Sequence, residues 1–146
     1  MKQLSNKYVG IELSNATMRE EDLIPSFLGF LNAIVEECEI QGEVNAIEEE
    51  VTQLEREDGD YKEEYREQAS WILNEDIWDL INNIAPDYTY FGSQEGDGAC
   101  YGFWTDDESL QDALMATIQE LEPQPELGDI RECCGYIINL LDVHQR

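Results

Sequence analysis

Basic residues are scarce in this chain. Its 146 residues include 34 Asp and Glu but only eight Lys and Arg, which gives a formal net charge of −26 at pH 7. A charge of this size keeps a protein soluble, repels nucleic acids and anionic membranes, and attracts basic surfaces. Direct binding of DNA or RNA is excluded, because it requires Lys and Arg to neutralise phosphates. The composition therefore predicts a basic protein or nucleoprotein complex as the partner.

Long apolar runs are also missing. No stretch approaches the roughly 18 consecutive apolar residues of a membrane span. The first seven residues lack the apolar core of a signal peptide, so we expect a cytoplasmic location. No Cys-x-x-Cys pair is present, and we expect reduced cysteines that act as small hydrophobic residues. These cysteines are Cys38, Cys100, Cys133 and Cys134.

Catalytic and metal-binding motifs are absent from the sequence. It contains no phosphate-binding loop, no Gly-x-Ser-x-Gly and no zinc-ligand spacing. The single histidine, His144, is expected to be a bystander near the end of the chain. Carboxylates at 58–60 and 95–98 alternate with glycine, which is typical of turns and lacks the ligand pattern of an EF-hand. We predict a non-enzymatic protein without metal or cofactor; a divalent-metal enzyme is the third hypothesis.

Aromatic residues and glycines concentrate in one stretch, residues 87–104. It holds six of the fourteen aromatic residues and four of the ten glycines. Two runs rich in β-forming residues, 88–91 and 100–104, flank a polar segment with several glycines, 92–98. The pattern predicts an antiparallel hairpin over 88–104, with a loop longer than two residues.

Apolar residues at helical spacing predict several helices. The clearest pattern covers 22–38, where Asp22 or the Thr17–Glu20 spacing signals the start and Pro25 is placed in the first turn. Pro86 ends a helix before the hairpin, and Pro123 ends one after it. The other predicted helices cover 43–57, 61–72, 75–84 with Asn74 as its cap, and 107–121.

The tail at 135–143 fits either a strand or a short helix. Its Tyr-Ile-Ile run favours a strand that joins the hairpin, since a bare hairpin is only marginally stable. A weakly alternating segment at 7–13 is a second candidate for an edge strand. The predicted fold is α+β, in a single domain of residues 1–146. A small antiparallel β-sheet, the hairpin 88–104 plus the C-terminal strand, is covered by several α-helices.

Negative charge is densest in a segment at about 40–68. From residue 36 to residue 67, fourteen acids stand against three basic residues. Such a segment is either a solvated face that serves solubility or a surface that occupies a basic groove, as duplex DNA would. Under the second interpretation, the partner-binding candidates are Glu48, Glu49, Glu50, Glu55, Glu57, Asp58, Asp60, Glu63 and Glu64.

Three blocks of the sequence, 14–27, 74–86 and 90–104, resemble a family of small phage- and plasmid-borne proteins. The most specific block is Tyr-Phe-Gly-x3-Gly-Asp-Gly-x2-Tyr-Gly-Phe-Trp at 90–104. The resemblance covers roughly half of the chain. It implies an origin in a mobile element and a closing strand at the C-terminus, and it implies no reaction. The acidic segment has no counterpart in it.

Small acidic proteins of mobile elements include DNA-mimicking antirestriction and anti-CRISPR proteins. By this analogy, the leading hypothesis is an interaction protein that blocks a basic, nucleic-acid-handling defence protein of the host. The alternative is a structural or regulatory phage protein that acts through the glycine-rich hairpin loop, with acidity serving only solubility. The sequence leaves the oligomeric state open.

Overall fold

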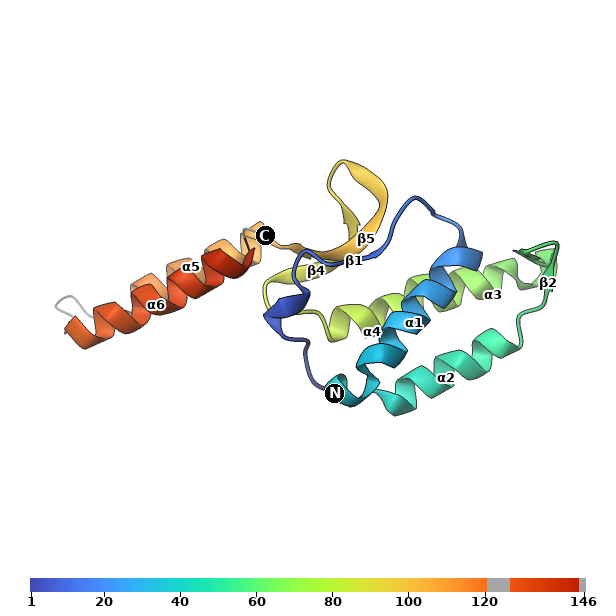
Figure 1. Ribbon diagram of the computed structural model, residues 1–146, viewed down its shortest axis with the longest axis horizontal. Coiled ribbons are helices and arrows are strands. Elements are labelled where there is room, and N and C mark those ends of the chain that lie inside the picture. Colours follow the sequence, from blue (N-terminus) through green and yellow to red (C-terminus); the bar gives the residue numbers. More distant parts are fainter. Residues whose placement is uncertain (121–126, 145–146) are drawn as a thin grey trace.

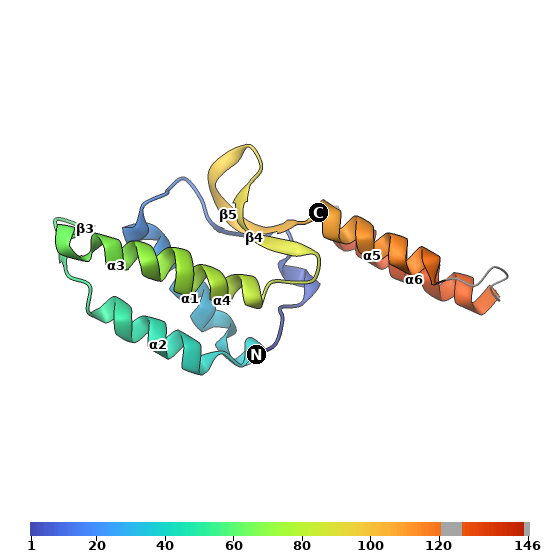
Figure 2. The ribbon, with the colours of Figure 1, turned by 180° about the vertical axis from the view of Figure 1, so that it is seen from behind.

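The chain forms a body and a projecting arm. The computed structural model describes residues 1–120 and 127–144. Residues 1–106 make up the body, and the antiparallel helices α5 (Asp107–Gln119) and α6 (Leu127–His144) make up the arm (Figures 1 and 2). Within the described ranges, no helix is both long enough and apolar enough to cross a membrane. The predicted α+β class is confirmed.

Helix α1 (Glu20–Cys38) lies at the centre of the body. Its predicted apolar stripe is buried, with Ile24, Phe27 and Leu31 fully enclosed. The predicted start was two residues late, and neither proposed capping side chain caps the helix. Arg19 is the N-cap residue, and the Thr17 hydroxyl instead accepts from the Arg19 N–H and donates to Asp22. Pro25 therefore lies inside the helix, beyond its first turn.

A three-stranded antiparallel sheet packs on α1. The strand order is β1 (Glu12–Ser14), β5 (Asp97–Thr105), β4 (Thr89–Gln94), so the hairpin gains its third strand from the N-terminal segment. The predicted C-terminal strand is wrong, because 135–143 lie within α6. In this helix Cys133 is buried and Ile137 is half-buried, and a separation of four residues places both on one face of the helix. A strand would place Gly135 on that face too, but Gly135 is exposed.

The hairpin turn is tighter than predicted. Gln94 pairs with Asp97, which leaves only Glu95 and Gly96 between the strands. Gly96 adopts a φ of 86°, a conformation that glycine adopts without a Cβ clash, and this allows the two-residue connection. A register shift beside Gln94 accommodates the remaining polar residues within the strands.

Aromatic rings join the sheet to the helices. Phe27 of α1 meets Phe91 of β4 edge-on with 5.1 Å between ring centroids, and it meets Tyr101 of β5 at 5.8 Å. On the other side of Phe91, the Trp78 ring lies 4.8 Å away. Such pairs add about 0.5–1.5 kcal/mol each beyond the area that they bury. The aromatic richness of the hairpin therefore serves the core.

The acidic segment folds differently from its prediction. Helix α2 (Gln41–Thr52) ends five residues early, and the chain then forms a small hairpin of β2 (Arg56–Glu57) and β3 (Asp60–Tyr61). Asp58 and Gly59 have φ values of 52° and 91°, as a two-residue hairpin turn requires. The seam Val44, Ile47, Val51 and Leu54 packs into the core, so it is internal rather than an interface.

One long helical stretch replaces the two helices predicted at 61–84. After the short 3-10 turn η2 (Glu63–Tyr65), it comprises α3 (Arg66–Trp71), the π-helical segment η3 (Ile72–Ile77) and α4 (Trp78–Asn83). Asn74 does not cap a helix, since its side chain donates back to the Ser70 carbonyl at 2.9 Å. Ile72 and Ile77 are both fully buried, and their separation of five residues matches the π-helical period.

The arm begins with a regular cap. The Asp106 side chain accepts from the Ser109 N–H at the start of α5, so Asp106 caps the helix predicted at 107–121. The described part of α5 reaches Gln119, and the predicted break at Pro123 lies outside the described residues. A hydrogen bond of 3.1 Å between the hydroxyls of Tyr88 and Tyr136 joins the arm to the body.

We predict that Gly102→Ala destabilises the body. A Cβ at this position would lie 2.3 Å from the carbonyl oxygen of Ile11, which belongs to the segment that leads into β1. The backbone must therefore shift, and we expect a loss of about 1–3 kcal/mol in the free energy of unfolding. Chemical denaturation measures it. Gly98→Ala is the control, because its Cβ would meet open space; an equal loss in both variants would contradict this account of the sheet.

Candidate functional site

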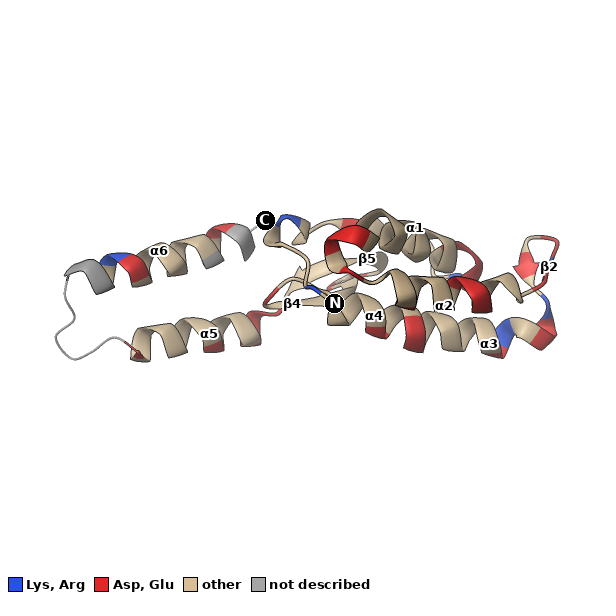
Figure 3. Cartoon of the chain, turned by 90° about the horizontal axis from the view of Figure 1, so that it is seen from below, with Lys and Arg blue, Asp and Glu red and all other residues tan. Residues whose placement is uncertain are grey.

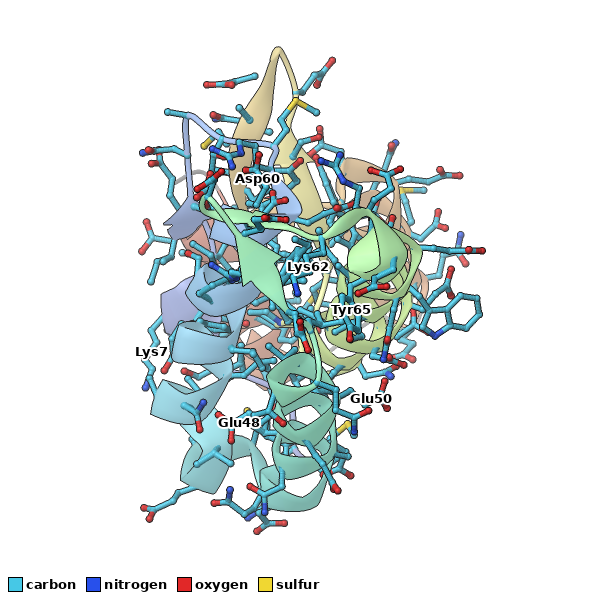
Figure 4. The ribbon with its side chains drawn as sticks, turned by 90° about the vertical axis from the view of Figure 1, so that its right-hand side faces the viewer. Lys7, Glu48, Glu50, Asp60, Lys62 and Tyr65 are labelled. Atoms are coloured by element: carbon cyan, nitrogen blue, oxygen red, sulfur yellow. The ribbon has the colours of Figure 1, made fainter. Side chains whose placement is uncertain are left out.

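The nine predicted partner-binding acids line one end of the body. Glu48, Glu49 and Glu50 belong to the last part of α2, Glu57 to Asp60 to the small hairpin, and Glu63 and Glu64 to η2. All are exposed except Glu48, which is half-buried. Figure 4 looks onto this end, with Glu48 and Glu50 on opposite sides of α2. The structure therefore spreads these acids over several faces.

Three of the nine acids are already neutralised by neighbours. Glu55 pairs with Lys62, Asp60 with Arg19, and Glu63 with Arg66. Glu48 accepts a hydrogen bond of 2.7 Å from the Asn32 amide of α1. For Glu49, Glu50, Glu57, Asp58 and Glu64, the described part of the chain offers no ion pair. These five acids keep their charge available to a partner.

The small hairpin is held on α1 through Glu21. Because Pro25 has no N–H, it leaves the Glu21 carbonyl without its usual helical partner, and the Arg56 guanidinium donates to that carbonyl at 3.3 Å. The Glu21 carboxylate accepts the Tyr61 N–H at 3.1 Å. Arg56 also lies over the Tyr61 ring, 4.7 Å from its centroid. The helix hydrogen bond that Pro25 removes is thus replaced by a contact that positions the acidic turn at Asp58.

These contacts lower the pKa of the Glu21 carboxyl. Desolvation alone would raise this pKa, but hydrogen bonds from the backbone N–H groups of Glu21 and Tyr61, with the charges of Arg19 and Arg66, outweigh it. The folded protein therefore favours the ionised carboxylate at neutral pH. Docking of the hairpin depends on that charge.

A groove with an acidic lining lies between α2 and the long helical stretch. It has a volume of about 430 Å³, and Ala46, Ile47 and Leu80 form part of its lining. The described residues that line it include five carboxylates and no Lys or Arg. Figure 3 shows acids on α2 and along the long helical stretch on this side. The carboxylates are Glu43, Glu50, Glu75, Asp76 and Asp79.

Trp71 stands at the wall of this groove. It exposes 62% of its surface, more than any other aromatic residue that the structure describes. An indole face attracts a Lys or Arg side chain, and surrounding carboxylates strengthen the attraction. Trp71 immediately precedes the π-helical segment, a feature that is frequent at functional sites. The groove is therefore suited to bind a cationic side chain.

Most of the groove escaped the sequence analysis. Only Glu50 was among its candidates. A usable signal was the stripe Trp71, Glu75, Asp79, with helical spacing of four residues. A second was the total lack of Lys and Arg between Arg66 and Arg131. The stripe was missed because separate helices were predicted on the two sides of Asn74.

The described residues give little support to a metal site or a reactive thiol. No group of three or more His, Cys, Asp or Glu there could hold a metal ion. The Asp97 carboxylate accepts the Ala99 N–H, as in a turn. Desolvation, with the charges of Glu12 and Asp97, raises the pKa of the Cys100 thiol, which disfavours a reactive thiolate. Cys38, Cys100 and Cys133 are buried as expected, whereas Cys134 is exposed.

Comparison of the chain with models of protein families, with curated proteins and with solved structures finds no match. The functional argument therefore depends on the geometry and charge of the groove and its surroundings.

We predict that Glu21→Gln loosens the small hairpin in a pH-dependent manner. At neutral pH the variant should unfold about 1–2 kcal/mol more easily, since a charged hydrogen bond is lost. The folded pKa lies below the ordinary value of 4.5, so the carboxylate's contribution is complete above that value. It is lost as the pH falls through the folded pKa, where wild type and variant should converge.

Chemical denaturation at a series of pH values tests this expectation. Glu57→Gln is the control, because Glu57 is exposed at the turn of the same hairpin. A difference between wild type and Glu21→Gln that stays constant down to acid pH would show that the charge of Glu21 is not what holds the hairpin.

Proposed function

We propose that this protein is a non-enzymatic interaction protein of a phage or other mobile element. It binds a basic, nucleic-acid-handling protein of the host, such as a component of a restriction or CRISPR defence system, and blocks it by presenting the charge of a nucleic acid. The observation that carries this proposal is the groove with five carboxylates, an exposed Trp71 and no described Lys or Arg in its lining.

The arrangement of the groove favours a protein partner over a small ion. Carboxylates on two neighbouring helices offer several charges along one surface, as successive phosphates do. An exposed tryptophan with a polar rim is typical of an interface hot spot, where the aromatic residue is desolvated on binding. Arg or Lys side chains of the partner would lie over Trp71 and between the carboxylates. The remaining acids would accelerate the encounter by long-range attraction.

The mobile-element origin and the action in the host cytoplasm are part of the same proposal. They rest on the resemblance of the 90–104 block to phage- and plasmid-borne proteins.

The alternative function acts through the hairpin tip. Ser93 to Gly98 are all exposed, and Glu95 and Asp97 add charge there. Of these tip residues, only Gln94 lines a described pocket, which has a volume of about 350 Å³ and one carboxylate, Glu12, in its lining. The tip therefore offers fewer charges to a partner than the acidic groove does. Under this alternative, Gly96→Ala would abolish function through its strained φ, whereas charge reversal in the groove would have no effect.

The partner can be isolated by affinity capture from host lysate at low salt. We expect a basic nucleic-acid-binding protein that is released as salt rises and is displaced by DNA or RNA. A partner that is indifferent to both salt and nucleic acid would contradict charge mimicry.

Charge reversal should separate the groove from the overall charge. Replacing Glu50, Glu75 and Asp79 with Lys should weaken binding of that partner on the order of 100-fold, because attraction becomes repulsion at the interface. The control variant reverses Glu36, Asp87 and Glu95, which are exposed and outside the groove lining. Each set changes the net charge from −26 to −20, since every replacement adds two units. If both variants lose the same affinity, the net charge of the protein and not the groove determines binding.

Trp71→Ala should weaken the same complex about tenfold or more without changing the net charge. The dependence of affinity on salt should stay as in the wild type, since no ion pair is removed. Trp71→Phe should restore part of the affinity through its ring face. Unchanged binding by Trp71→Ala, measured by calorimetry, would place the interface elsewhere on the body.

A further inference from the structure

The arm carries an apolar surface that the rest of the chain leaves uncovered. Of the side chains described in α5 and α6, only Leu110 and Cys133 are buried. Five large apolar side chains, in contrast, expose between 37% and 65% of their surface. They are Met115, Ile118, Ile130, Ile138 and Leu141, and we call them the apolar face of the arm.

Helical periodicity places these side chains on one side of the arm. In α5, Ile118 and Met115 follow at roughly 80° and 140° from the buried Leu110. Leu110 lies within roughly 20° of Thr117, whose carbonyl meets Cys133 of α6, so it marks the side towards α6. In α6, Ile130 and Ile138 follow at roughly 60° and 140° from Cys133, whose Sγ lies 3.9 Å from the Thr117 carbonyl of α5. Because the two helices are antiparallel, equal rotations about their axes lead to the same side of the pair.

The opposite side of the arm is the one that touches the body. Tyr136 is roughly 60° from Cys133 in the other direction, and its hydroxyl meets that of Tyr88. This hydrogen bond, with burial and the charge of Asp87, raises the pKa of Tyr88 to about 12, so the contact persists at neutral pH. The apolar face therefore points away from the body.

Charge on the arm argues against a basic occupant. Residues 113–119 of α5 and 133–141 of α6 contain no charged residue, although the chain as a whole carries −26. A basic protein would find no carboxylate in the middle of this face, and an anionic membrane is repelled by the rest of the chain. A second copy of the chain brings the same uncharged, apolar face, which is complementary to it.

We propose that two copies associate through the apolar faces of their arms. Two helical pairs stacked face to face form an antiparallel four-helix bundle, the usual way in which a pair of amphipathic helices buries its second side. The arm projects from the body, so the two acidic bodies stay apart when the arms pack (Figures 1 and 3). The dimer is thus compatible with the repulsion between bodies.

The size of the face sets the expected affinity. A face of two helices, about 20 Å long and about 20 Å wide, offers roughly 400–500 Å² per copy. The total of about 1,000 Å² is at the lower limit of specific interfaces. We therefore expect a reversible dimer with a dissociation constant on the order of micromolar.

Sedimentation equilibrium of the full chain, from about 1 to about 300 µM, tests the dimer. We expect the mass to double with concentration and the dimer to tighten as salt rises, because salt screens the repulsion between the bodies. This salt dependence is opposite to that of the groove's partner, so failure of one proposal leaves the other intact. A monomer at every concentration, or an assembly larger than two chains, would overturn the dimer.

Ile138→Glu should abolish the dimer, since it introduces a charge into the middle of the apolar face. Met18→Glu is the matched control, because Met18 is 67% exposed on the body whereas Ile138 is 65% exposed on the arm. Circular dichroism checks that both variants fold. A dimer that survives Ile138→Glu, or that Met18→Glu also destroys, would show that the arm is not the interface.

Alkylation of Cys134 gives a second readout without any substitution. Cys134 is the one exposed cysteine among the four and lies between Ile130 and Ile138 on the apolar face. Its reaction rate with a thiol reagent should fall several-fold as the concentration passes through the dimer range. A rate that is independent of concentration while the mass doubles would move the interface away from the arm.

Discussion

The packing of Phe27 against the hairpin is the contact on which the body depends. This ring meets Phe91 and Tyr101 from two different strands, and Trp78 closes the cluster from the long helical stretch. Helix α1 is thereby fixed between the sheet on one side and α2 with the long stretch on the other (Figure 1). Both walls of the groove take their positions from α1.

Self-repulsion is the opposing constraint. A net charge of −26 disfavours any compact state, and the described ion pairs are exposed and contribute little. The fold accommodates this repulsion by keeping its described charges out of the core. Among the described residues, no polar or charged residue is buried. Several of the acids that remain unpaired lie on α2 and the long stretch, and an interaction function can use them.

Local pattern predicted those elements whose burial follows a single period. The stripe of α1 and the aromatic strands of the hairpin are of this kind, and both are correct in type. The weak alternation at 7–13 was only the second candidate for the third strand, and β1 covers its end, Glu12–Ser14. The tail was preferred because local pattern does not show the close approach of Ile11 to Gly102 that holds β1. The tail was assigned wrongly, since its β-branched residues suit a strand locally while their spacing serves packing against α5.

The groove lay beyond sequence reasoning for a related reason. Its lining comes from two helical segments whose relative rotation depends on the π-helical turn between Ile72 and Ile77, and no local residue preference announces that turn. The exposure of Trp71 was predictable from its charged neighbours. Its position opposite Glu50 was not, because that requires the tertiary arrangement of α2 and α3.

Pro25 has a consequence for the order in which the body assembles. The carbonyl that it leaves unpaired in α1 is satisfied by Arg56, 35 positions away from Glu21 in the chain. The first turns of α1 and the β2–β3 hairpin therefore make up one cooperative unit, in which neither part is complete alone. Its opening would show as shared hydrogen-exchange rates of amides in two segments that are distant in sequence, slower than a fraying helix end would give.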